Sequence, residues 1–387
     1  MDSFDYLDGK KTLPSAVEGR PCGFLPKLMG AEDVEEDLRI EPYADYKSDF
    51  FSAFVVRASQ MTKLEGRCGF FTPYVWMFIQ SYEKLRQYLY SQATLETLIQ
   101  FEYSAFEEAT VPVCTFTFAN RHVNKKGNYL RLVDFRGGME VQRQKTLEAI
   151  ANHDCGFYYE QSTDNFAKIP GSPVAYWVSE NFIGTFLRGI SIDSISKYTG
   201  SQNITANNEK YLRYIWEVVN TEVGTNTHWA VYIKGGTYRK WYGNIELVVD
   251  WSDSAREFYK NNPTSNLLGK PYRFREGITY TELTSGTNSF RYLPAIAIFD
   301  KKGPCIVDVQ HRSYCLAFFN TKVAVEYFKL LNPTITLQVK DVKNTPIIFD
   351  DAYMQDVESI ANSNVELCRK DWDSFETSWD FKHHPLV

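Results

Sequence analysis

The densest group of DNA-binding side chains in the sequence is the run Arg239-Lys240-Trp241-Tyr242-Gly243-Asn244. Arginine binds guanine edges or phosphates, asparagine pairs with adenine, and a large ring packs along a sugar-phosphate backbone. The glycine allows a tight turn that brings these groups close to a groove. We therefore predict DNA contacts for Arg239, Lys240, Trp241 and Asn244. The alternative is a strand with a basic outward edge and a buried tryptophan.

A second candidate is the turn Lys197-Tyr198-Thr199-Gly200-Ser201-Gln202-Asn203, whose polar side chains and glycine suit a DNA-contacting loop. Thr199, Gly200 and Asn203 are the contacts predicted there, and a solvent-exposed loop is the alternative. Single arginines could bind phosphates or form surface ion pairs of small consequence. These are Arg213, Arg273, Arg275 and Arg291.

The net charge of −6 conceals an uneven distribution. Residues 1–46 carry 11 acids and 5 bases, and residues 341–387 carry 10 acids and 4 bases, so each end contributes −6 and the middle is +6. Because phosphate binding depends on Lys and Arg, the distribution places a DNA-binding surface inside the chain. An excess this small also arises by chance in soluble domains, so it permits DNA binding without requiring it.

Motifs for other chemistry are absent from the sequence. It contains no GxSxG, Walker, HExxH or EF-hand pattern, and its seven cysteines are scattered without a CxxC, so we predict no metal site. Asp341-Val342-Lys343 has the spacing of a nuclease core but lacks an upstream Pro-Asp. No apolar run approaches the ~20 residues of a membrane span, and the first residues do not resemble a signal peptide. We predict a cytoplasmic protein with no membrane contact.

The hydrophobic periodicity predicts alternating helices and strands before residue 170 and short strands after it. The first part matches the second half of a doubly wound sheet. The predicted helices cover 48–64, 81–90, 140–152, 208–219 and 321–331, and the predicted strands before residue 170 cover 67–72, 97–101, 113–118 and 129–135.

Several tryptophan-rich and glycine-rich runs resemble the PglX family, the adenine-specific DNA methyltransferases of bacterial BREX phage-defence systems. The runs are Lys168 to Pro173 with Ala175-Tyr176-Trp177, Lys234-Gly235-Gly236 through Asn244, Phe274 to Thr279, Leu331 to Thr334 and, most specifically, Asp371 to Phe381. In the first half, Lys47-Ser48-Asp49, Thr72-Pro73, Trp76-Met77 and Glu83 to Arg86 fit the same family. The resemblance covers about residues 43–384.

The resemblance implies an α/β plus α+β fold, with a partial doubly wound methyltransferase sheet followed by a target recognition domain of short strands and helices. We expect an irregular N-terminal segment at 1–46, the late methyltransferase strands and a connector at 47–169, target recognition at 170–350 and a helical tail at 351–387. The closing pattern of such domains is present at Phe319 to Lys322 and around Asp341. Lys340 stands where the family usually has glycine, which puts the turn before Asp341 in doubt.

The motifs that would bind S-adenosylmethionine and catalyse methyl transfer are missing. Glu41-Pro42-Tyr43 is the nearest match to the Asn/Asp-Pro-Pro-aromatic loop that holds a flipped adenine, and it lacks the amide and the second proline. Leu132 to Gly138 imitates the cofactor turn, but no buried strand ending in an acid follows it. We predict no cofactor in this chain, with S-adenosylmethionine expected for the complete enzyme.

These observations predict the DNA-recognition portion of a BREX-type adenine-N6 methyltransferase, inactive alone. Its expected partners are double-stranded DNA and either a separate catalytic half or other BREX components. Two alternatives stay open. One is an active methyltransferase with degenerate motifs, and the other is a protein-interaction module of a phage-defence complex.

Overall fold

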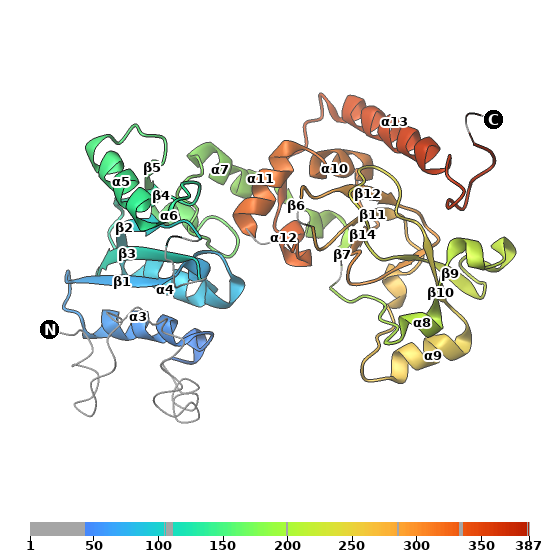
Figure 1. The fold of residues 1–387 in the computed structure, drawn as a ribbon, viewed down its shortest axis with the longest axis horizontal. Helices are drawn as coiled ribbons and strands as arrows, with labels where there is room; N and C mark the ends of the chain where they lie inside the picture. Colours follow the sequence, from blue (N-terminus) through green and yellow to red (C-terminus); the bar gives the residue numbers. More distant parts are fainter. Residues whose placement is uncertain are drawn as a thin grey trace. The chain divides into compact units, whose positions relative to one another are not determined.

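The computed structural model describes residues 43–103, 105, 111–198, 200–284, 286–332, 336–384 and 386. The chain divides between Leu187 and Arg188 into two compact units, which we call unit 1 and unit 2 (Figure 1). Small sheets and helices alternate in both, which confirms the predicted mixed α/β class. No helix in the described part of the chain is long and apolar enough to cross a membrane.

Unit 1 is built on a five-stranded sheet in the order β1-β3-β2-β4-β5. Because β3 lies between β1 and β2 and is antiparallel to both, β1 and β2 run in the same direction. Strand β4 is parallel to β2, and β5 is antiparallel to β4. The strands are β1 (Arg67–Pro73), β2 (Thr94–Gln100), β3 (Val113–Ala119), β4 (Lys126–Arg131) and β5 (Tyr158–Ser162).

The helices of unit 1 follow the predicted periodicity. Helix α3 buries Phe51, Val55 and Ser59, which recur every four residues, and it lies along β1 (Figure 1). The elements predicted up to residue 152 are therefore present, with shifted ends. The helices are α3 (Phe50–Met61), α4 (Glu83–Gln92), α5 (Gly138–Ala151), α6 (Thr163–Phe166) and α7 (Glu180–Arg188), the last of which reaches the division between the units.

A buried arginine ties the segment after residue 170 into unit 1. Arg86 is 1% exposed, and its guanidinium donates to the carbonyl oxygens of Trp76 (2.6 Å), Ile79 (2.8 Å) and Gly171 (2.6 and 3.0 Å). The buried Tyr176 hydroxyl donates to the side chain of Gln100 at 2.6 Å. The change of pattern seen in the sequence near residue 170 therefore falls inside this compact unit.

Strand β1 is the outer strand of the described sheet. Two backbone hydrogen bonds flank its pairing with β3. The Asn120 N–H donates to the Gly66 carbonyl, and the Tyr74 N–H donates to the Pro112 carbonyl. By the antiparallel alternation, the backbone groups of Arg67 and Gly69 point away from β3. Within the described residues, no backbone hydrogen bond to either of them reaches across this edge.

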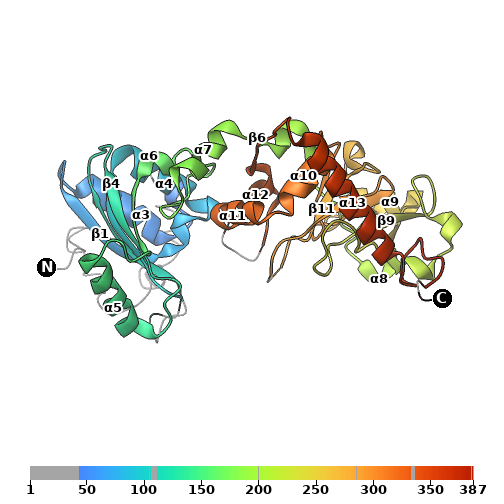
Figure 2. The same cartoon turned by 90° about the horizontal axis from the view of Figure 1, so that it is seen from above.

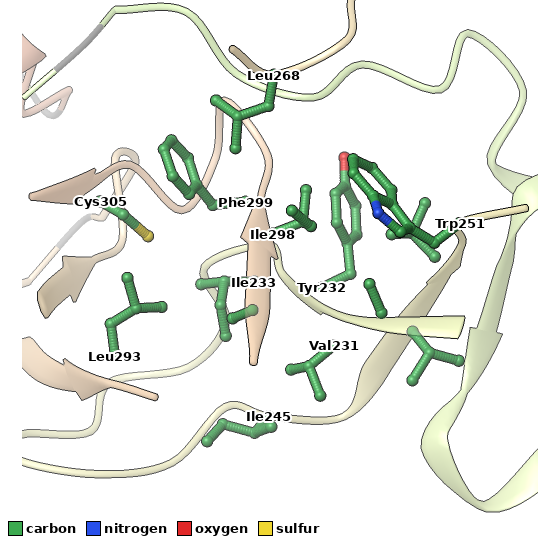
Figure 3. Close-up of a cluster of buried hydrophobic side chains, with 14 of the residues drawn as sticks. Val231, Tyr232, Ile233, Ile245, Trp251, Leu268, Leu293, Ile298, Phe299 and Cys305 are labelled. Carbon is green, nitrogen blue, oxygen red and sulfur yellow. The ribbon is translucent and has the colours of Figure 1, made fainter. Parts of the chain in front are cut away.

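Unit 2 contains two four-stranded sheets, ordered β13-β9-β10-β8 and β12-β11-β14-β7, and a two-stranded sheet, β15-β6. The strands are β6 (Ile190–Ser191), β7 (Lys197–Tyr198), β8 (Leu212–Tyr214), β9 (Trp229–Ile233), β10 (Leu247–Asp250), β11 (Gly277–Tyr280), β12 (Phe290–Leu293), β13 (Ala297–Phe299), β14 (Cys305–Val307) and β15 (Pro346–Ile347). Figure 3 shows the core on the first of these sheets, where Val231, Tyr232 and Ile298 lie near Trp251.

Helices cover parts of these sheets, and α13 lies alongside α10 (Figure 2). The predicted helix over 208–219 is wrong, because α8 ends at Tyr211. The β-branched and aromatic residues that follow favour extended backbone, and Leu212–Tyr214 pairs with β10. The helices are α8 (Asn208–Tyr211), α9 (Asp253–Asn261), α10 (Arg312–Phe319), α11 (Lys322–Leu331), α12 (Val339–Lys343) and α13 (Met354–Trp372).

Candidate nucleic-acid interface

The predicted run at 239–244 lies in the loop between β9 and β10. The Asn244 side chain bonds back to an earlier part of this loop. The Asn244 amide nitrogen donates to the carbonyl of Thr237 at 2.8 Å, and the side chain is only 9% exposed. A Cβ on Gly236 would lie 2.8 Å from Asn244 Cγ, so this close approach requires glycine, which also has φ +114°. In this structure Asn244 therefore shapes the loop and presents little of itself to a ligand.

The two cations of the run are also engaged. Arg239 Nη1 lies 3.0 Å from a carboxylate oxygen of Asp371, and its guanidinium stacks 4.9 Å above the centroid of Trp372. Lys240 Nζ donates to the carbonyl of Asn320 at 2.8 Å. Trp241, with φ +73°, exchanges backbone hydrogen bonds with β12 and packs partly on a core cluster. The run thus fixes the β9–β10 loop to α13, to the end of α10 and to β12.

Arg291 lies buried beneath this loop. It is 0% exposed, and its guanidinium donates to the carbonyl of Arg239 (3.2 Å), to Ser289 and to the Thr281 hydroxyl (3.1 Å), which in turn donates to the carbonyl of Gly236. No carboxylate in the described part of the chain pairs with it. Burial lowers the pKa of Arg291 to about 10, so it stays charged at neutral pH and adds positive potential under the loop.

The other predicted residues are spread over unit 2. Thr199 lies outside the described residues, and its neighbour Gly200 is exposed. Asn203 is 0% exposed and holds the backbones of Phe299 and Leu268. Arg213 bonds carbonyl groups at the end of α8, whereas Arg275 is exposed, 3.9 Å from Asp308. The structure therefore groups only the 239–244 run and Arg291, and it leaves Gly200 and Arg275 at separate surface positions.

Sequence reasoning missed a pair of basic turns at the ends of two parallel strands. Because β13 and β9 pair with Phe299 opposite Ile233, the turn Lys234-Gly235-Gly236 meets the turn Lys301-Lys302-Gly303. A Cβ on Gly235 would lie 2.6 Å from the carbonyl oxygen of Lys302, so the two backbones touch there. The recurring Lys-Gly pattern was the available signal, but only the strand pairing brings the turns together.

The first of these turns borders an open groove of about 540 Å³, which is lined by Gly236, Thr237, Tyr238, Leu283, Thr284, Gly286 and Thr287. Tyr238 is 58% exposed, and Lys301 is exposed without an ion pair in the described residues. Lys302 contacts Glu282 at 3.3 Å. Lysines and exposed aromatic rings are the kinds of side chain that bind a phosphate backbone, and the buried Arg291 charge adds positive potential nearby.

The turn from Leu132 to Gly138 does not fit S-adenosylmethionine. It connects β4 to α5, as a cofactor turn would, and Gly137 has φ +128°. However, the strand after α5 is β5, which is antiparallel to β4, so no acid at its end can face a cofactor held by this turn. Among the residues that the structure describes, no three His, Cys, Asp or Glu side chains are placed to bind a metal.

Comparison with known proteins finds relatives among adenine-specific DNA methyltransferases. It is 30% identical to the adenine-specific methyltransferase PglX of Lacticaseibacillus casei (strain Zhang), over 94% of this chain and 32% of that protein. It is 29% identical to the adenine-specific methyltransferase BrxX of Escherichia coli O9:H4 (strain HS), over 94% of this chain and 30% of that protein. The predicted resemblance to PglX is thus confirmed, and the chain spans about a third of the length of these curated relatives.

Two further comparisons concern one segment of the sequence and the fold. Residues 29–106 match the family model of the Eco57I restriction-modification methylase. The fold is similar to that of the type IIL restriction-modification enzyme MmeI, solved in complex with DNA, with a TM-score of 0.53, 11% identity and coverage of 90% of this chain and 48% of that one.

Proposed function

We propose that this homologue of the PglX and BrxX adenine-specific methyltransferases is the DNA sequence-recognition portion of such an enzyme and does not methylate DNA alone. The similarity along 94% of the chain carries the proposal. In the proposed arrangement, unit 2 contacts double-stranded DNA. The cofactor turn and catalytic loop come from a separate catalytic half or from another component of a BREX-type system.

The basic turns of unit 2 support DNA as the ligand. Lys234, Lys301 and Lys302 stand at one sheet end, and Gly236, two residues after Lys234, lines a groove that a phosphate backbone could follow. Each phosphate contact releases counterions, which makes the affinity depend on salt. In this proposal Arg239, Lys240, Trp241, Asn244 and Arg291 act mainly by fixing the loop, while Gly200 and Arg275 are separate candidate contacts.

Two features of unit 1 support the proposal that a separate catalytic half is needed. Its sheet keeps β1, β2 and β4 in one direction, and the outward backbone groups of Arg67 and Gly69 leave β1 able to pair with another strand. The misfit of the 132–138 turn to the cofactor also favours a chain that is inactive alone.

DNA affinity measured at several salt concentrations tests the proposal. We expect a linear log-log dependence for the parent chain, and Lys301→Ala should reduce the slope by about one and weaken binding evenly across sequences. Lys260→Ala, an exposed lysine on α9 outside the two turns, is the matched control and should leave the slope unchanged. Binding without salt dependence, or an equal effect of both variants, would contradict the proposal and favour a protein-interaction module.

Titration of S-adenosylmethionine into the pure chain separates a recognition portion from an active enzyme with degenerate motifs. We expect no saturable heat at micromolar concentrations. Saturable binding, together with methyl transfer to DNA, would establish the second function.

A further inference from the structure

Unit 2 exposes an unusual aromatic pair on the segment after β8. The rings of Tyr214 and Trp216 stack with centroids 4.6 Å apart and planes 8° apart. Tyr214 is 47% exposed and Trp216 is 50% exposed, and the neighbouring Val219 is 63% exposed. Large rings usually lie in the core, so a half-exposed stacked pair indicates a binding surface.

The backbone beside this pair is closed to strand addition. Ile215 donates to Glu246, so by the antiparallel alternation Leu212 and Tyr214 point their backbone groups away from β10. The outward N–H of Tyr214 donates to the Glu217 carboxylate at 2.7 Å, and Arg213 donates to the carbonyl of Leu212 at 2.6 Å. A partner must therefore bind through the side chains.

The charged residues around the Tyr214 and Trp216 rings indicate what kind of partner this surface binds. Residues 209–229 contain three acids, Glu209, Glu217 and Glu222, against two bases, Lys210 and Arg213, whose guanidinium is held by the carbonyl of Leu212. Glu246 is exposed next to Ile215. This acidic excess disfavours phosphates and favours a cationic partner.

We propose that Tyr214, Trp216 and Glu217 form a docking platform for an arginine-containing segment of a protein partner. A planar guanidinium stacks on an aromatic face and donates to a carboxylate at the same time, which a lysine ammonium does less well. The hydrogen bond to Tyr214 holds the Glu217 carboxylate beside the rings, so the platform is organised before binding. This function is separate from DNA recognition and does not depend on it.

A direct test uses the full chain and a fluorescent peptide of alternating glycine, serine and arginine. We expect saturable binding that weakens about tenfold in Trp216→Ala and in Glu217→Gln. The glutamine oxygen can still accept from Tyr214 N–H, so the second variant removes only the charge. Tyr353→Ala, at an aromatic ring that is 62% exposed elsewhere in unit 2, is the matched control and should bind like the parent.

Peptide chemistry and NMR locate the contact. Replacing each arginine by citrulline, which is neutral and of nearly the same shape, should abolish binding, and lysine should weaken it. In the ¹⁵N-labelled chain, one of the eight tryptophan indole signals will be absent from Trp216→Phe, and that signal should shift when the arginine peptide is added to the parent.

Several outcomes would overturn the platform. They are no peptide binding at millimolar concentration, equal binding by Trp216→Ala, or equal binding of the citrulline peptide. Weaker DNA binding by a folded Trp216→Ala chain would show a nucleic-acid surface instead. Loss of self-association in that variant would show a second copy as the occupant. Neither of these two results would bear on the basic turns at Lys234 and Lys301.

Discussion

Strands β1 and β8 are both outer strands of their sheets, but only β8 has its edge closed. At β8, the side chains of Arg213 and Glu217 occupy the outward backbone groups of Leu212 and Tyr214. At β1, no such bond to the backbone of Arg67 or Gly69 is found in the described part of the chain. Outer strands in folded proteins usually have their free backbone groups covered, because an uncovered edge can pair with strands of other chains.

The difference between the β1 and β8 edges indicates where another strand can pair with this chain. The closed edge of β8 prevents strand addition at that side of the β13-β9-β10-β8 sheet. The open edge of β1 supports the proposal above that further strands of a methyltransferase sheet pair with it. Both interpretations can be tested by blocking the open edge and by opening the closed one.

Blocking β1 should have the largest effect. We expect the chain to self-associate through this edge. Gly69→Pro should weaken the association by about a hundredfold, because proline lacks the outward N–H and disturbs the strand pairing next to it. Sedimentation velocity over a wide concentration range measures this.

Gly69→Ala is the matched control for that experiment. Its Cβ would meet only the Thr117 methyl group, at 3.7 Å, and it keeps the N–H, so it should associate like the parent. A parent chain that stays monomeric at all concentrations would show that the β1 edge is not available for pairing.

Opening β8 should have a smaller effect. Removing both side chains with Arg213→Ala and Glu217→Ala deletes the two hydrogen bonds that close the edge and should lower the free energy of unfolding by about 1–3 kcal/mol. Urea denaturation measures the loss. The double variant should also self-associate through β8, and this association should persist when Gly69→Pro is added. A double variant with the stability and the association of the parent would show that the two edges do not differ.

The sequence predicted unit 1 better than unit 2, for a physical reason. Helix α3 and strands β1 to β3 have strong local periodicity, and their pattern was sufficient to locate them. After α8, short strands alternate with turns, and long-range pairing with β10 decides that Leu212–Tyr214 is extended. Local propensity cannot supply that information.

The candidate interface shows the same limit. The composition of the 239–244 run suggested ligand contacts, but tertiary packing buries Arg291 and turns Asn244 toward Thr237. The lysines of the two basic turns are 67 residues apart in the sequence, Lys234 to Lys301, and only the parallel pairing of β13 with β9 joins them. Side-chain type was readable from the sequence, whereas exposure and proximity were not.

The smallest expected effect concerns the apolar side of the open edge. Phe71 is 49% exposed on β1, close to Phe101, with ring centroids 6.2 Å apart. Phe71→Lys places a charge where another strand would approach, and charges on edge strands oppose pairing. We expect self-association to weaken roughly threefold to tenfold, which is less than for Gly69→Pro because the backbone donors remain. Sedimentation at low and high salt measures this, and the lysine effect should shrink at high salt as repulsion is screened. An effect as large as that of Gly69→Pro would mean that apolar contact, and not backbone pairing, drives association at this edge.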